Sequence, residues 1–368
     1  MGIEITDEWP LGAFDQATMI ARSLLEASRG DVTAAREPLH TMIAAIVLPG
    51  SSRDDVVALT NQVLAHPDIS VLATHHTQPH HTAPAHSTGG RLIAASGSWD
   101  CTVRIWDPLA GTQIGTPLTG HTAVVWSVAL GTAPDGRLIA ASAGSADATV
   151  RIWDPLAGTQ IGAPLTGHTS RVWSVALGTA RDGRLIATSG SSDNTVRIWD
   201  PLIGTPIGTP LTGHTDVVGS VALGTARDGR LIAASGSHDM TVWIWDPLAG
   251  TPIGPPLTGH TNSVRSVALG TAPDGRLIAA SGSDDATVRI WDPLAGTQIG
   301  PPLTGHTSTV TSVAWGNAPD GRLIAATGSG DFTMRIWDPL AGTPIGPPLT
   351  GHTESVWSVA LGIAALTK

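Results

Sequence analysis

The chain has 368 residues, of which 41% are hydrophobic and 14% are charged, and its formal net charge is −10. This acidic balance, without a basic stripe, argues against a nucleic-acid partner, and the single cysteine, Cys101, excludes an internal disulfide. No stretch reaches the roughly 18 uninterrupted apolar residues of a membrane span, and the acidic start lacks the basic region of a signal peptide. We therefore expect a cytoplasmic protein that binds neither nucleic acid nor membrane.

Residues 1–70 have the pattern of a helical N-terminal segment. Apolar residues recur at helical spacing between Asp15 and Arg29, and they are followed by Gly30, a residue type that often ends a helix. A second helix is predicted to begin at Pro38 and a third near Ser52. Two interpretations stay open, a cap that docks on the rest of the chain and a fragment of a larger helical domain.

Residues 71–90 are predicted to be a linker rich in His and Pro. His75 lies 46 residues before His121, but the prolines and histidines from Gln78 to Pro84 do not suit a buried inner strand. The imidazoles between His75 and His86 could bind a transition metal. The Pro-rich composition favours adventitious, flexible binding instead, so we predict no metal site and no cofactor.

Residues 91–368 consist of near-identical copies of one repeat. The pair Trp-Asp recurs with Trp at 106, 153, 199, 245, 291 and 337, at intervals of 47, 46, 46, 46 and 46 residues. The pair Gly-His recurs in the same rhythm, with His at 121, 168, 214, 260, 306 and 352. Self-similarity at such a period is typical of a repeat architecture.

Each repeat is predicted to supply four short strands. In the second complete copy, the segment 172–177 is apolar on both faces and suits an inner strand, a turn Arg-Asp-Gly follows, and segments 184–188 and 195–199 supply two more strands. The last segment of a repeat, such as Gly250–Leu257, contains several prolines. Because proline removes a ladder donor, this segment should be the edge strand.

A Gly-His pair followed 31 or 32 residues later by Trp-Asp resembles the WD-repeat family, in its bacterial form with near-identical copies. The resemblance implies an all-β propeller, a ring of four-stranded blades around a central channel. In this family each sequence repeat is offset from the blade: its edge strand belongs to one blade, and the three strands that follow belong to the next blade. Residues 91–118 then lack an inner strand, which residues 349–362 can supply. We therefore predict a six-bladed ring closed by the C-terminal strand; a degenerate seventh blade from residues 40–74 is the alternative.

The resemblance also implies a buried tetrad of His, Ser or Thr, Asp and Trp in each blade. A Ser-His-Asp hydrolase needs one such set, whereas here the set recurs six times, which favours a structural network. The first blade lacks a His, which His352 could provide. The sets are His121, Ser142, Asp147 and Trp153; His168, Ser189, Asp193 and Trp199; His214, Ser235, Asp239 and Trp245; His260, Ser281, Asp285 and Trp291; His306, Thr327, Asp331 and Trp337; and Ser96, Asp100 and Trp106 with His352.

The copies differ at a few offsets, two, three and five residues after each His and just before each tetrad Asp. In the family these offsets map to one face of the ring and to the mouth of its channel, where partners dock. Trp and Arg dominate interface energetics, although the tryptophans could also pack between blades as extra core. The candidate partner-binding residues are Trp99, Trp126, Arg171, Trp173, Asp216, His238, Arg265, Asp284 and Trp357.

The predicted function is that of a scaffold without a catalytic site, a monomeric ring that binds a protein or peptide on this face. One alternative is a sensor or regulatory module of a larger bacterial signalling or NTPase system. A propeller hydrolase with a metal or carboxylates in its channel is a further alternative. No His, Asp or Glu set departs from the sixfold pattern as such a centre would require.

Overall fold

The computed structural model describes residues 92–144, 146–318 and 321–361. The chain divides into two compact units, one of residues 79–97 and 101–368 and the other of residues 1–78 and 98–100. The described part of the larger unit contains strands and no helix, so it is all-β as predicted, and these ranges offer no helix that could cross a membrane. The predicted helical segment 1–70 and the linker 71–90 lie outside the described residues.

The described strands form six antiparallel sheets, five of four strands and one of three, each with its strands in chain order. The three-stranded sheet contains β1 (Ala94–Gly97), β2 (Val103–Asp107) and β3 (Thr112–Leu118). The four-stranded sheets contain β4 (Val125–Thr132), β5 (Leu138–Gly144), β6 (Val150–Asp154) and β7 (Thr159–Gln160); β8 (Val172–Thr179), β9 (Leu185–Ser191), β10 (Val196–Asp200) and β11 (Thr205–Pro206); β12 (Val218–Thr225), β13 (Leu231–Ser237), β14 (Val242–Asp246) and β15 (Thr251–Pro252); β16 (Val264–Thr271), β17 (Leu277–Ser283), β18 (Val288–Asp292) and β19 (Thr297–Gln298); β20 (Val310–Asn317), β21 (Leu323–Ser329), β22 (Met334–Asp338) and β23 (Thr343–Pro344).

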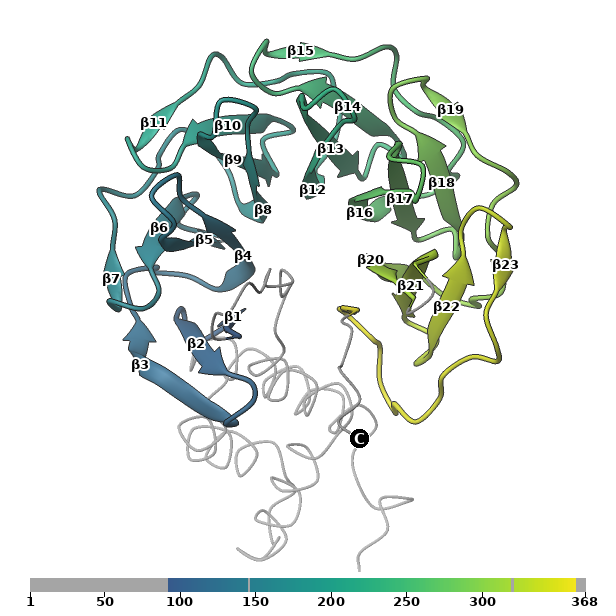
Figure 1. Cartoon of the computed structure of the whole chain (residues 1–368), viewed down its shortest axis with the longest axis horizontal. Helices are drawn as coiled ribbons and strands as arrows, with labels where there is room; N and C mark the ends of the chain where they lie inside the picture. The colour runs from purple at the N-terminus through teal and green to yellow at the C-terminus, as the bar shows by residue number, and fades with distance from the viewer. Residues whose placement is uncertain (1–91, 145, 319–320, 362–368) are drawn as a thin grey trace, which may run out of the picture. The chain divides into compact units, whose positions relative to one another are not determined.

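The first strand of each four-stranded sheet, namely β4, β8, β12, β16 and β20, is an inner strand. Figure 1 shows the inner strands turned toward a common centre, with the fourth strands at the periphery. Each inner strand contacts the next one along the chain. The second strands are buried along their whole length in β9, β13 and β17, because they have a neighbouring strand on either side and further sheets on both faces.

The hydrophobic core lies between neighbouring sheets. In one buried cluster, Ile152 of β6 packs with Val172 of β8 and Trp199 of β10, and the same grouping recurs along the chain. Burying an apolar side chain of this size contributes roughly 1.5–3 kcal/mol. Each sheet therefore depends on its neighbour, as expected for a repeat architecture.

The fourth strands lie at the edges of their sheets, as the prolines predicted, and each is only two residues long. β15 pairs with β14 over Thr251–Pro252, Ile253 N donates to Ile244 O (2.7 Å), and pairing resumes at a single bridge between Leu257 and Val242. Pro255 and Pro256 lie between these two places and have no amide hydrogen to donate. Such an edge offers few donors to another sheet and so discourages edge-to-edge association.

The C-terminal segment continues the stacking of inner strands. Val359 N donates to Ser312 Oγ (3.2 Å), which repeats the bond between successive inner strands in which Val221 N donates to Ser174 Oγ (3.1 Å). Val356 and Val359 are buried against Ala326 of β21. Residues 350–361 nevertheless contain no strand, and β1 pairs with β2 alone in the described part of the chain. The closure of the first sheet by this segment thus stays a prediction.

Candidate binding pocket at the starts of the inner strands

Five sets of His, Ser or Thr, Asp and Trp are joined by hydrogen bonds. In the set around Ser235, Trp245 Nε1 donates to Ser235 Oγ (2.8 Å), His214 Nε2 lies 2.8 Å from the same oxygen, and His214 Nδ1 lies 2.8 Å from Asp239 Oδ2. One assignment satisfies every group: Nδ1–H donates to the carboxylate, and the Ser hydroxyl donates to Nε2. The other four sets are centred on Ser142, Ser189, Ser281 and Thr327.

The set around Ser142 forms despite one extra residue in the turn before its carboxylate. His121 Nδ1 lies 2.6 Å from Asp147 Oδ2, and Trp153 Nε1 donates to Ser142 Oγ (2.8 Å). Burial raises the pKa of Asp147, but the hydrogen bonds and charge of His121 and the hydrogen bonds of Thr149 outweigh it and lower the pKa to about 2. The carboxylate is therefore ionised at neutral pH and holds the turn in place.

These networks have a structural role that serves the neighbouring surface. Asp239 accepts N–H groups from Thr215, just after the tetrad His, and from Thr241, just after the turn that precedes β14. The network thereby fixes together two loops at the same end of the sheet. The central hydroxyl of Ser235 is 0% exposed and bonded on both sides, so it is not accessible as a nucleophile.

Among the described residues, the first sheet shows only part of a tetrad. Trp106 Nε1 donates to Ser96 Oγ (2.8 Å), as in the other sets. His352, which the sequence predicted as the missing member, is exposed, and the structure does not bring it to Ser96. Asp100 belongs to the other compact unit, where its amide donates to Ser98 Oγ (3.2 Å). The predicted tetrad is therefore not assembled among the described residues, because the segment that carries His352 lies against the last sheet.

A pocket of about 390 Å³ lies at the starts of the inner strands. Its wall contains the residue at the fifth position after the His of every repeat, so one sequence offset from six repeats meets in one place. We call it the Trp/Arg pocket. These six residues are Trp126, Trp173, Gly219, Arg265, Thr311 and Trp357. The other lining residues are Ser174, His238, Asp284, Ser308, Thr309, Gly330 and Ser355.

One side of the pocket is aromatic. The rings of Trp126 and Trp173 lie 5.2 Å apart between centroids with an interplanar angle of 39°. Trp173 Nε1 donates to Ser192 Oγ (2.6 Å), which holds the indole in one orientation. Trp357 lines the same pocket and is 44% exposed. This side can therefore take an apolar group that is removed from water on binding.

The other side is polar and is organised around Arg265. Its Nε lies 2.9 Å from both carboxylate oxygens of Asp284, and its Nη2 lies 2.7 Å from Oδ2. Its Nη1 donates to Nε2 of His238 (3.1 Å). The imidazole nitrogen must be the acceptor, because a guanidinium has only donors. Burial and the positive charge of Arg265 lower the pKa of His238, so the imidazole is neutral at pH 7.

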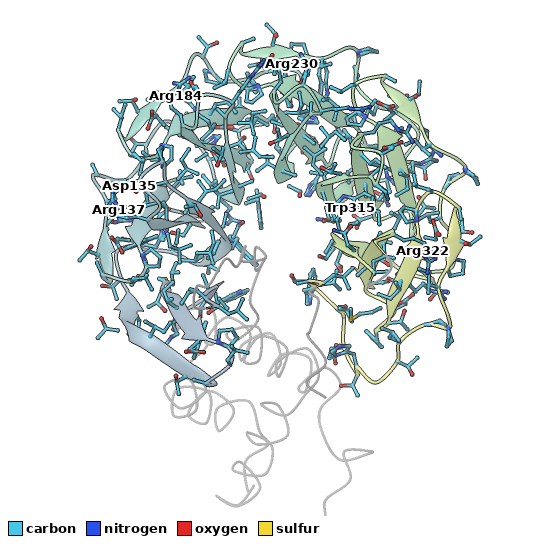
Figure 2. The ribbon with its side chains drawn as sticks, viewed as in Figure 1. Asp135, Arg137, Arg184, Arg230, Trp315 and Arg322 are labelled. Atoms are coloured by element: carbon cyan, nitrogen blue, oxygen red, sulfur yellow. The ribbon has the colours of Figure 1, made fainter. Side chains whose placement is uncertain are left out.

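An apolar region lines the interior beside the pocket. A second cavity of about 200 Å³ is lined by the inner strands and shares Ser174 with the first one. The same position of each inner strand contributes one valine, namely Val128, Val175, Val221, Val267 and Val313. Figure 2 shows Trp315 on the inner side of β20; it packs beside Gly270 where the other inner strands have Leu.

The structure brings six of the nine candidate residues together in the Trp/Arg pocket. Arg171 and Asp216 are exposed in loops that precede inner strands but do not line it, and Trp99 belongs to the other compact unit. Gly219 and Thr311 were not chosen from the sequence, although their offset singled them out. Ser174 could not be found this way, since every repeat has Ser there. The residues brought together are Trp126, Trp173, His238, Arg265, Asp284 and Trp357.

The described residues include no group of three His, Cys, Asp or Glu side chains placed to hold a metal ion. What the Trp/Arg pocket offers is an apolar wall, an oriented guanidinium and several hydroxyls. These are the features of a recognition surface, where a few fixed polar groups orient a ligand against apolar ones.

Comparison with known proteins assigns the class of this repeat. The family model "WD domain, G-beta repeat" matches residues 68–107, 111–154, 159–200, 204–246, 250–292 and 297–338. The chain belongs to this family, as the Gly-His and Trp-Asp pattern predicted. The first match includes residues 71–90, which lie outside the described residues, so their interpretation as a linker stays a prediction.

One curated relative is similar over a short stretch. The peroxisomal targeting signal 2 receptor of Mus musculus is 40% identical over 52 residues. The match covers 14% of this chain and 16% of that protein, so it spans about one sixth of the relative's length.

Proposed function

We propose that this protein is a scaffold without a catalytic site of its own, and that it binds a protein or peptide partner in the Trp/Arg pocket. The observation that carries the proposal is the convergence of one variable offset from six repeats on a single cavity. Framework positions repeat from copy to copy because they maintain the sheets. Positions that vary within such a framework and also share a pocket are free to serve recognition.

Membership of the WD-repeat family supports a binding role, because these rings commonly present partner sites at the mouth of the channel. The relative named above is, by its name, a receptor for a targeting signal, and a receptor also acts by binding. The local chemistry agrees with this role. Trp173 and Arg265 belong to the residue types that contribute most to the energy of protein interfaces.

The test is a pull-down from cells with the tagged full-length chain, compared with the double variant Trp126→Ala, Trp173→Ala. Wild type should retain a protein that the variant loses, while near-ultraviolet circular dichroism shows that the variant is folded. Leu248→Ala, in an exposed turn on another part of the molecule, is the matched control and should retain the partner. A folded double variant that captures the same proteins as wild type would disprove the proposal.

A further inference from the structure

We infer that the Trp/Arg pocket recognises a short peptide segment in which an acidic side chain lies close to a large apolar one. This inference rests on the proposed function and specifies the chemistry of the partner. It follows from the N–H groups of Arg265 that Asp284 and His238 do not engage, and from the aromatic wall of the same pocket.

Arg265 has donors to spare. A guanidinium carries five N–H groups, and Asp284 and His238 engage three of them, one each on Nε, Nη1 and Nη2. Two N–H groups remain, one on each Nη atom, and the side chain is 42% exposed. Two donors on neighbouring nitrogens suit a carboxylate, which can accept both.

The guanidinium is also held in place before any partner arrives. The bidentate contact with Asp284 fixes its plane, and the bond to His238 fixes its rotation. Asp284 is 14% exposed and both of its oxygens already accept from Arg265, so an incoming cation would meet the guanidinium first. Because the arginine loses little freedom on binding, its donors favour an acidic group over a basic one.

The rest of the pocket determines what accompanies the acid. Trp126, Trp173 and Trp357 offer indole faces that suit an aromatic or aliphatic side chain. The volume of about 390 Å³ is near the lower end of ligand pockets, which span about 300–1,000 Å³, so it suits one or two side chains of a chain that crosses it. Hydroxyls of Ser308 and Ser355 at the wall can bond to the backbone of such a chain. We therefore assign the acid to a side chain within a segment and not to a chain end.

The experiment uses a displayed library of random heptapeptides, selected on the immobilised full chain. Recovered peptides should contain Asp or Glu within three positions of Trp, Phe, Leu or Met. One of them is then synthesised with both ends blocked, beside its Glu→Gln or Asp→Asn version, and titrated by calorimetry. The loss of one charge-assisted pair at a half-exposed site should weaken binding by about tenfold.

The variant that tests the arginine is the pair Arg265→Gln, Asp284→Asn, which removes the guanidinium without leaving the half-buried carboxylate of Asp284 unpaired. On this variant the acidic and amide peptides should bind equally. The matched control is Arg230→Gln, Asp228→Asn, which removes the same two charges from an exposed pair at the other end of β12. Figure 2 shows Arg230 at the periphery of the molecule. This control should keep the tenfold preference.

Several results would overturn the inference: basic or neutral peptides from the selection, equal affinities on wild type, or a preference that survives in the Arg265 pair variant. If such peptides still lose affinity with Trp126→Ala, Trp173→Ala, only the acidic specificity is wrong and the proposed function stands. If the library yields no binder and the pull-down is also unaffected by the tryptophan variant, both are wrong.

Discussion

Gly190 of β9 lies directly against Val218 of β12, the first residue of the next inner strand. A Cβ added to Gly190 would be 2.7 Å from Val218 Cγ1 and 3.0 Å from its carbonyl oxygen. The same contact joins Gly236 to Val264 and Gly282 to Val310. These glycines let neighbouring sheets approach closely, so the stacking of sheets depends on the absence of a side chain there.

Replacement of Gly190 by alanine should therefore destabilise the protein. Overpacking of this kind costs typically about 1–3 kcal/mol, since the backbone of a buried strand must shift. In Gly219→Ala the new Cβ would meet only the ring of His238, with Nε2 at 3.7 Å and Cδ2 at 3.9 Å, and the change in free energy of unfolding should stay within about 0.5 kcal/mol. Urea denaturation of both variants measures the difference. Equal stability of the two would contradict the close approach.

The tetrads allow a comparison within one chain. Ser235→Ala leaves two buried groups, His214 Nε2 and Trp245 Nε1, without their partner. Each such group costs about 1–3 kcal/mol. Ser96→Ala removes a partner from Trp106 alone in the described part of the chain, so it should cost about half as much. Chemical denaturation of both variants tests this order, and a larger loss for Ser96→Ala would mean that the first sheet has a complete network.

The sequence predicted the four-strand repeat and five of the six tetrads, because each follows from a local pattern that recurs along the chain, whereas the tetrad that relied on the distant His352 is not assembled among the described residues. The contrast with the constant framework also singled out a few variable offsets, and the structure shows that one of them, the fifth residue after each His, lines the pocket in all six repeats. The sequence did not predict the pairing of Arg265 with both Asp284 and His238, because these residues come from two different repeats and meet only when two sheets stack. Nor could it place Arg171 outside the pocket, because only the structure shows that β8 begins at Val172, which leaves Arg171 in the preceding loop and Trp173 in the strand that lines the pocket.

The ionised tetrad carboxylates should make the free energy of unfolding depend on pH in the acidic range. The pKa of Asp147 falls from 3.8 to about 2 on folding, because His121 and Thr149 outweigh the effect of burial. A carboxylate with a lowered folded pKa contributes stability above its unfolded pKa, and this contribution is lost as the pH falls from about 4 to about 2. The Asp147→Asn variant should thus be less stable than wild type at pH 6, and the gap should narrow below pH 4.

Urea denaturation at pH 6, 4, 3 and 2.5 measures that gap. The control is Asp135→Asn, whose carboxylate is exposed and paired with Arg137 across a turn. Solvent screens such a pair, so its variant should differ little from wild type at any of these pH values. A gap for Asp147→Asn that stays constant down to pH 2.5 would contradict the lowered pKa.

The closure of the first sheet can be tested by a cross-link. In every four-stranded sheet the same position of the inner strand pairs with the same position of the second strand, as in Ala129 with Ala141 and Ala222 with Ala234. The equivalent residues are Ala360 in the C-terminal segment and Ala95 in β1. If this segment completes the first sheet, their Cβ atoms should be about 4.5–5.5 Å apart. The lower end of this range meets the Cβ–Cβ distance of about 3.5–4.5 Å that a disulfide allows.

The variant Ala95→Cys, Ala360→Cys in a Cys101→Ser background should then form an intramolecular disulfide under mild oxidation, detected by a mobility shift that a reductant reverses. The control Ala95→Cys, Ala326→Cys should not cross-link, because Ala326 pairs with Ala314 inside the last sheet. The bond from Val359 to Ser312 already places the C-terminal segment one step beyond β20. The next partner in that direction, if six sheets complete the ring, is the edge of β1 opposite β2, which has no partner strand among the described residues. An absent cross-link in a folded variant would mean that residues outside the described ranges occupy that edge.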